Sequence, residues 1–248
     1  MLTPYRVVSP YRPFAPESAF HQRLGPFDWP RALTYLARTV HESCHVETVA
    51  LTDADTSLPI PAFRYRTEEP HLMLWLLEVA RDYLASDDFN CDTVMVCPDV
   101  LVFGDLSPWF THDLTVMCRR AEKYQRRPIL NSVQWWSHAA KAPLVAFYTN
   151  LLTIARALPS GAIRWGADTL PFVQLLAPFD PISRRHGLTV HCVDINDVMR
   201  AYSRRAREKL LTHQPLIPLA APLLDFRSHR KQDLFAYADA VRREVQAA

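Results

Sequence analysis

The chain alternates between short, continuously apolar runs and longer segments in which apolar residues recur every three or four positions. Continuous runs are typical of strands covered on both faces, and the recurring pattern is typical of helices that cover a sheet. We expect strands at 5–11, 46–52, 94–96, 114–118, 128–136 and 188–193. We expect helices at 30–44, 71–86, 138–158, 172–176, 197–211 and 232–246. This order predicts a single α/β domain with a mostly parallel central sheet flanked by helices.

The segment 92–110 carries the first candidate site residue. Val94, Met95 and Val96 form an apolar run, and Pro98 follows two residues later. Proline has no backbone N–H to donate within a sheet, so we expect it to end the strand and to leave Asp99 at a turn. A carboxylate that follows a central strand lies where open α/β sheets bind ligands. The alternative is that Asp99 only satisfies the turn.

Composition narrows the class of protein. Only 5 of the 248 residues are glycine, so a Gly-rich phosphate loop is missing, which argues against Rossmann dinucleotide binding and P-loop chemistry. The five cysteines are widely spaced and odd in number, which favours reduced thiols in a cytoplasmic protein. No apolar run approaches the ~20 residues of a membrane span, and the first residues lack the pattern of a secretory signal.

Charge is unevenly distributed along the chain. Residues 42–113 contain 14 Asp and Glu against 3 Lys and Arg, whereas residues 184–243 contain 12 Lys and Arg against 6 Asp and Glu. The acidic half suits a metal site, and the basic half suits an anionic ligand or acceptor. Solvated helix faces are the alternative explanation of both.

Two short motifs resemble nucleotide-sugar glycosyltransferases of the GT-A fold, particularly family-8-like enzymes. The turn Cys97-Pro-Asp99 resembles their Asp-x-Asp turn, with Cys97 at its first acidic position. Residues 225–231 resemble their His-Phe-Lys-Gly-x-x-Lys segment, with Asp225 in place of the metal-binding His, Arg227 in place of the first Lys, and Lys231 as the last Lys. The resemblance implies that Asp99 and Asp225 hold Mn²⁺ or Mg²⁺ on the donor diphosphate, and oxygen ligands suit both ions.

The resemblance also assigns the nucleoside end of the donor. Tyr11 and Arg12 follow the first strand, where Tyr11 would stack on the base and Arg12 would meet a phosphate. Asp53 ends the second strand and would bind the nucleoside. A surface loop at Tyr11 and an Asx turn at Asp53 are the alternatives.

Two further segments would meet the sugar and the acceptor. Asn131 matches an Asn that contacts the donor sugar in GT-A enzymes, although Val133 stands where glycine is usual. Trp165 and Asp168 resemble a Trp-x-x-Asp segment in which the Asp acts as a base toward the acceptor or bonds the sugar. Asp168 as the N-cap of the following helix is the alternative.

Together these motifs imply one domain over 1–248, with the basic helical part 197–248 completing the site. Its reaction would move a sugar from a nucleoside diphosphate sugar, a UDP-sugar being favoured, to an acceptor hydroxyl. The basic helix predicted at 197–211 favours DNA as acceptor, for example a hydroxymethylated base of the kind some phages modify, in the host cytoplasm if the chain is phage-encoded. A glycan or protein acceptor stays open. The arginines of this helix are Arg200, Arg204, Arg205 and Arg207.

Two other classes of function compete with this interpretation. The sequence His41-Glu-Ser-Cys-His45 is an H-E-x-x-H motif, which in zinc proteases lies inside a continuous helix. Here the β-branched run after Val46 predicts a strand directly behind it. A catalytically inactive nucleotide-binding module is the other alternative, and Cys97 at an acidic position favours it.

Overall fold

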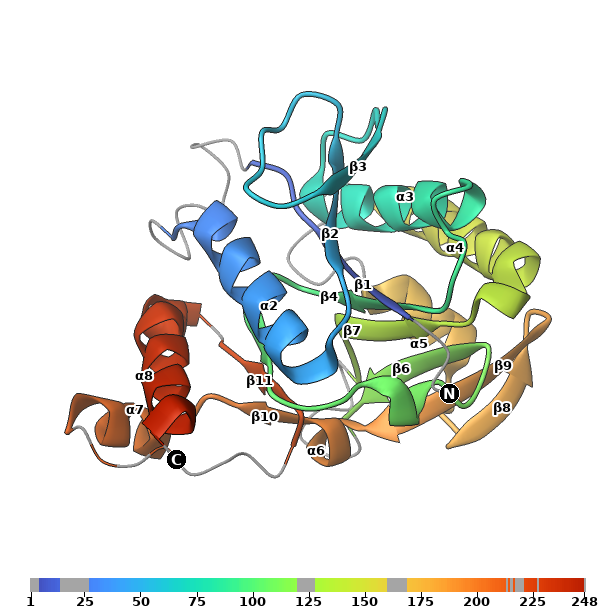
Figure 1. Ribbon diagram of the computed structural model, residues 1–248. Helices are drawn as coiled ribbons and strands as arrows, with labels where there is room; N and C mark the ends of the chain where they lie inside the picture. The colour runs from blue at the N-terminus through green and yellow to red at the C-terminus, as the bar shows by residue number, and fades with distance from the viewer. Residues whose placement is uncertain are drawn as a thin grey trace.

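An eight-stranded sheet forms the centre of the molecule in the computed structural model (Figure 1). The structure describes residues 5–13, 27–119, 128–159, 169–212, 214, 216, 221–226 and 228–247. In this part of the chain the strands run in the order β3-β2-β1-β4-β7-β6-β9-β8, and four of the seven pairings are parallel. The strands are β1 (Arg6–Pro10), β2 (Thr48–Asp53), β3 (Ala62–Tyr65), β4 (Thr93–Val96), β6 (Leu114–Cys118), β7 (Ile129–Trp136), β8 (Ile182–Arg185) and β9 (Leu188–Asp194). The predicted α/β fold with a mostly parallel sheet is confirmed.

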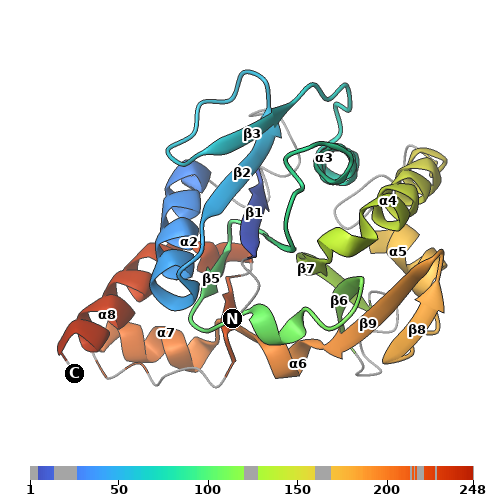
Figure 2. The same cartoon turned by 45° about the vertical axis from the view of Figure 1, so that its right-hand side comes forward.

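Helices cover both faces of this sheet (Figures 1 and 2). One face carries α3 (Leu72–Ala85), α4 (Lys141–Arg156) and α5 (Thr169–Leu176), and the other carries α2 (Trp29–Cys44). Neighbouring residues of β1 show the division, since Val8 belongs to the core on the α3 side and Val7 to the core on the α2 side. Because both faces are covered, the central strands are continuously apolar.

The helix ends follow from local sequence. The carboxylate of Asp28 accepts a hydrogen bond of 3.0 Å from the backbone N–H of Arg31, and Pro30 lies in the first turn of α2. The imidazole of His71 accepts from the N–H of Met73 at the start of α3. α3 is apolar over more than one face because it lies against both the sheet and α4.

A second, three-stranded sheet joins the middle of the chain to its C-terminal part. Its order is β10-β11-β5, in which β11 is parallel to β10 and antiparallel to β5. Its strands are β5 (Val100–Val102), β10 (Met199–Ala201) and β11 (Leu223–Asp225). The remaining elements are the 3₁₀ segments Ser107–Trp109, His138–Ala140 and Ser228–Asp233, and the helices α6 (Ile195–Val198), α7 (Arg204–Leu211) and α8 (Leu234–Ala247).

The prediction of a helix over 197–211 is wrong for the first half of this range. The structure has a single turn at α6, then strand β10, and only then the helix α7. Met199 pairs with Leu223 and is 2 % exposed, so strand pairing and burial outweigh the local helical pattern. Arg200 therefore lies on a strand, apart from the three arginines of α7.

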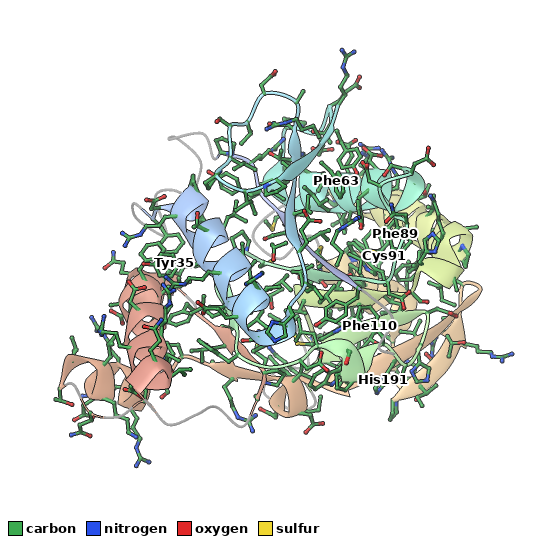
Figure 3. All side chains as sticks on the ribbon, viewed as in Figure 1. Tyr35, Phe63, Phe89, Cys91, Phe110 and His191 are labelled. Atoms are coloured by element: carbon green, nitrogen blue, oxygen red, sulfur yellow. The ribbon has the colours of Figure 1, made fainter. Side chains whose placement is uncertain are left out.

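The two edge strands of the large sheet were not predicted from the sequence. β3 follows the prolines at 59 and 61, and β8 is a polar strand that forms a hairpin with β9. Both are only partly buried, so neither has the apolar signature of the inner strands. Figure 3 labels Phe63 of β3, whose ring stacks on that of Tyr83 in α3 at 5.9 Å between centroids. Within the described residues, no helix has both the length and the apolar character needed to cross a bilayer.

One buried polar network fixes β7 against α4. The hydroxyl of Tyr148 donates to the side-chain oxygen of Gln134, and the indole N–H of Trp136 donates to the Tyr148 hydroxyl at 3.1 Å. Burial raises the pKa of Tyr148 above its usual value, so the hydroxyl keeps its proton and remains a donor. The network therefore holds the strand that passes beside the candidate site.

Tyr148→Phe should lower the free energy of unfolding by about 1–3 kcal/mol, because it removes the hydroxyl and leaves buried polar groups unsatisfied. Urea unfolding of the variant and of the unaltered chain would measure this change in the free energy of unfolding. Asn150→Ala, on the exposed side of the same helix, should stay within about 0.5 kcal/mol. An effect of Tyr148→Phe no larger than that of this control would contradict the role given to the network.

Candidate functional site

The candidate site lies at one edge of the large sheet. The parallel strands β1, β2 and β4 all end at this edge, and the antiparallel strand β7 begins there. The backbone N–H of Cys97, just past β4, donates to the carbonyl of Ser132 in β7 at 2.8 Å. Tyr11, Asp53, Asp99 and Asn131 consequently lie along the same edge, which is where α/β sheets bind ligands.

Asp99 and Asp225 come together through strand pairing. Asp225 is the last residue of β11 and is opposite Val100 in β5. The backbone N–H of Phe226 donates to the carbonyl of Asp99 at 3.0 Å. The backbone of Asp99, one residue before β5, thus lies beside the end of β11, although 126 positions separate Asp99 from Asp225 in the sequence. The resemblance placed these two residues at one site; their predicted role as metal ligands stays a prediction.

Local structure explains why Asp99 lies at a turn. β4 ends at Val96, and the N–H of Val100 donates to the carbonyl of Cys97 at 3.1 Å, which closes the turn. Pro98 cannot donate within a ladder, as expected from the sequence. Asp225 is held on its other side, where its carbonyl accepts the N–H of Tyr202 at 2.9 Å. Asp225 is only 4 % exposed.

Lys231 is the third member of this cluster. Its ammonium forms a salt bridge with the Oδ2 atom of Asp99 and lies 4.6 Å from the centroid of the Trp29 ring. Lys231 is 3 % exposed, and the side chain of Asp99 is 17 % exposed. A buried ammonium is costly without a partner, so the pairing with Asp99 is needed to keep it inside the fold.

The end of β1 is tied to the segment before α3. The Arg12 guanidinium donates to the carbonyls of Glu69 and Pro70 at 2.7 and 2.6 Å, and it lies 5.0 Å from the centroid of the Trp75 ring. Burial lowers the pKa of Arg12 from its usual value, but the group stays cationic. These contacts give Arg12 a structural role, which leaves the predicted phosphate contact as a prediction.

Tyr11 and Asp53 lie at the ends of neighbouring strands. The N–H of Tyr11 donates to the carbonyl of Leu51 at 2.9 Å. Burial, together with the charges of Asp28 and Asp53, raises the pKa of Tyr11, and the residue is only 7 % exposed. The Asp53 carboxylate accepts from the N–H of Thr56 at 3.1 Å and from its hydroxyl, which is the Asx-type turn considered as an alternative.

The remaining predicted donor and acceptor residues divide into two groups. Asn131 is part of β7, is half-buried and lies near the Cys97 turn. Trp165, Asp168 and Arg227 fall outside the described residues, so their predicted roles stay predictions. α5 begins at Thr169, directly after Asp168 in the sequence.

Asp99 and Asp225 have the oxygen ligands that a hard divalent cation prefers. Mg²⁺ is commonly held by one or two carboxylates together with substrate phosphates, so the chemistry of these two side chains is compatible with the predicted cation. Within the part of the chain that the structure describes, no three His, Cys, Asp or Glu side chains group into a self-sufficient metal site. Binding of a divalent cation here would therefore need phosphate oxygens as further ligands. It would also need the Lys231 ammonium to leave Asp99.

The H-E-x-x-H motif does not have the geometry of a zinc protease. α2 ends at Cys44, and His45 adopts the left-handed conformation with a φ of 56°. Its backbone N–H donates to the carbonyl of His41 at 3.2 Å, as a helix cap does. The helix therefore stops before the second His, and the described residues provide no third ligand.

The predicted basic patch is divided in the structure. Arg200, on β10, donates to the carbonyl of Asn196. Arg204, Arg205 and Arg207 are exposed on α7, and Arg207 also pairs with Asp233 at 2.9 Å. Of the four predicted arginines, the three on α7 are therefore grouped on one helix, whereas Arg200 is exposed on β10.

Sequence analysis missed the part of the site supplied by α2 and α8. Trp29, at the start of α2, lies under the Lys231 ammonium, and α8 follows directly after Lys231 and its 3₁₀ segment. The hydroxyl of Tyr35 and the guanidinium of Arg38 donate to Asp239 of α8 at 2.7 and 3.0 Å, and Figure 3 labels Tyr35 where α2 faces α8. Only tertiary contacts reveal this arrangement.

Comparisons with known proteins place the fold. No family model matches the chain, and no curated protein matches it. A solved glycosyltransferase involved in glycosylation of the major capsid of PBCV-1 aligns with a TM-score of 0.54 and 10% identity, over 96% of this chain and 99% of that one. The glycosyltransferase GlyE of Streptococcus pneumoniae TIGR4 aligns with TM-scores of 0.56 and, in its apo form, 0.57. These alignments have 10% and 12% identity and cover 99% of this chain but 64% of GlyE. The chain thus has a glycosyltransferase fold.

Asp239→Asn should weaken the docking of α8 in a pH-dependent way. Burial raises the pKa of Asp239, but the hydrogen bonds from Tyr35 and Arg38 outweigh burial and lower the pKa below the usual value. The stabilisation is therefore present above the unfolded pKa of ~3.9 and is lost as the pH falls through the folded pKa. The side chain is 37% exposed, so the loss at neutral pH should be below about 1 kcal/mol.

Thermal unfolding at neutral and at strongly acidic pH would measure this difference between Asp239→Asn and the unaltered chain. The gap should narrow as the pH is lowered. Asp87→Asn, at an exposed position after α3, is the control and should show no such gap. A gap that persists in strong acid would contradict the assignment.

Proposed function

We propose that the chain is a glycosyltransferase that moves a sugar from a nucleoside diphosphate sugar to an acceptor hydroxyl. The observation that carries the proposal is that strand pairing brings the backbone at Asp225 to that of Asp99, whose carboxylate pairs with Lys231, at the edge where the parallel strands end. Two carboxylates and an ammonium are the groups needed to hold a diphosphate with a divalent cation. The shared fold of glycosyltransferase structures supports the same conclusion.

Each residue at the edge has a distinct part in this proposal. Tyr11 and Asp53, at the ends of β1 and β2, bind the nucleoside of the donor, which we take to be a UDP-sugar. Asn131 orients the sugar, with Trp165 beside it. Lys231, with Arg227, neutralises the diphosphate as it leaves, an effect that is strong where water is excluded. Asp168 positions the acceptor hydroxyl or takes its proton.

Asp99 and Asp225 would hold Mn²⁺ or Mg²⁺. When bound, the cation neutralises the charge that develops on the departing diphosphate. The protein contributes a rigid backbone here. Because β5 and β11 are paired, these strands need no reorganisation at Asp99 and Asp225 when the donor binds.

The double change Asp99→Asn and Asp225→Asn should reduce donor hydrolysis and transfer by about 100-fold or more, the scale seen when charge stabilisation is removed from an active site. Release of nucleoside diphosphate from UDP-sugars measures it, with circular dichroism to show that the variant is folded. Asp87→Asn removes one exposed carboxylate far from the site and should keep the full rate.

A normal rate in the double variant would refute the proposed site. Nucleotide binding without turnover in the unaltered chain would instead support the inactive binding module, which Cys97 favours. A thermal-shift screen of nucleoside diphosphate sugars, with and without Mn²⁺, identifies the donor first, since a ligand that binds the folded state raises its melting temperature.

DNA is the acceptor that we propose on the basis of α7. Arg204, Arg205 and Arg207 are exposed there, on the helix that follows β10, the strand that pairs with β11. A duplex base would need to be extruded to reach the site. A protein acceptor is the alternative, and the similar PBCV-1 structure is of an enzyme involved in glycosylation of a capsid protein.

Replacing Arg204, Arg205 and Arg207 with Ala should weaken binding to a DNA fragment and reduce the slope of log K against log salt by about 2–3, one phosphate contact for each arginine. Electrophoretic retention over a series of salt concentrations measures the slope. The control removes three exposed arginines elsewhere, Arg66, Arg184 and Arg243, and should change the slope less. If the unaltered chain does not bind DNA even at low salt, DNA is excluded as the acceptor.

A further inference from the structure

The ammonium of Lys231 is bound to the carboxylate that is expected to hold the divalent cation. It pairs with the Oδ2 atom of Asp99, at the turn where the resemblance places the metal. Lys231 is 3 % exposed, so this is a buried pair and not a solvent-exposed contact at the rim. The position predicted for the divalent cation therefore already has a cationic group of the protein beside it.

The surroundings keep Lys231 in place. Trp29 lies 4.6 Å from the ammonium, so the ring face adds to the attraction of the carboxylate. The 3₁₀ segment Ser228–Asp233 leads directly into α8, which Asp239 fastens to Tyr35 of α2. Lys231 is thus fixed at both its backbone and its charged end.

A divalent cation that arrives alone meets two obstacles. It would have to displace the ammonium from Asp99, and Lys231 would then be left buried beside a second positive charge. Cys97 at the first acidic position means that the turn provides one carboxylate and not two. Asp99 and Asp225 are therefore a weak site for a lone cation.

A nucleoside diphosphate removes both obstacles. Its oxygens supply the ligands that the protein lacks, and its negative charge gives Lys231 a new partner when the ammonium leaves Asp99. Conversely, a diphosphate that draws Lys231 away without a divalent cation leaves Asp99 as an unneutralised carboxylate that repels it. Each ligand thus lowers the cost of binding the other, which is a positive coupling between them.

We propose that Lys231 occupies Asp99 until the donor arrives, so that the divalent cation and the nucleoside diphosphate bind together and neither binds well alone. This inference rests on the proposed function and adds a positioning role to Lys231. The ammonium exchanges one anionic partner, Asp99, for another, the diphosphate, and no covalent bond changes.

Mn²⁺ binding followed by electron paramagnetic resonance tests the proposal without any measurement of turnover. In the unaltered chain, UDP should tighten Mn²⁺ binding by about tenfold or more, within the usual range of coupling between two ligands. Lys231→Met should bind Mn²⁺ without UDP at least about tenfold more tightly than the unaltered chain, and UDP should then add less. Adding Asp99→Asn to Lys231→Met should abolish this gain.

Lys141→Met is the matched control, because Lys141 lies at the start of α4 and donates to the carbonyl of Ser86. It should bind Mn²⁺ like the unaltered chain. Tight Mn²⁺ binding by the unaltered chain without UDP would overturn the proposal, and so would Lys231→Met binding Mn²⁺ no more tightly.

Failure of the proposed function gives a different result. If no nucleoside diphosphate binds in the presence of Mn²⁺, the donor assignment fails, whereas the gain of Mn²⁺ binding in Lys231→Met still reports on Lys231 and Asp99. The coupling in the unaltered chain needs no variant, so it tests the proposal even if Lys231→Met does not fold.

Discussion

The antiparallel pairing of β5 with β11 is the interaction on which the candidate site depends. It places Asp225 beside Val100, brings the N–H of Phe226 to the carbonyl of Asp99, and directs the following segment so that Lys231 returns to the same carboxylate. Backbone hydrogen bonds fix these positions more rigidly than side-chain contacts would. The large sheet supplies the edge, and the small sheet, with the turn before β5 and the segment after β11, brings the charged residues of the candidate site to it.

The balance of charge at this edge follows from burial. Two carboxylates and one ammonium are enclosed with little solvent, so each group is sensitive to which partner it has. A buried ion pair contributes little net stability compared with an apolar pair of the same size. The proposed role of the pair between Lys231 and Asp99 is instead that each group can change its partner when ligands bind. By contrast, the Arg12 guanidinium at the end of β1 already has structural partners, because it donates hydrogen bonds to two backbone carbonyls.

Local pattern in the sequence predicted the inner strands and most helices, because burial on two faces leaves a continuous apolar run and burial on one face leaves a helical period. It also identified Asp99, Asp225 and Lys231 as one cluster, but only through resemblance to a known motif. The pairing of Lys231 with Asp99 was not predicted, since the resemblance assigned one residue to the metal and the other to the diphosphate. Arg200 was misplaced because a three-residue strand such as β10 forms only through its partner β11. Edge strands β3 and β8 were missed because they are only partly buried and so lack a continuous apolar run.

The order of the elements along the chain has a consequence for biosynthesis. The last strand of the central sheet ends at Asp194, whereas Asp225 and Lys231 are translated about 30 residues later. At the usual ~5–20 residues per second, the nascent chain could build its scaffold before the tail emerges from the ribosome. During that interval the edge of β5 that later pairs with β11 is open to another chain.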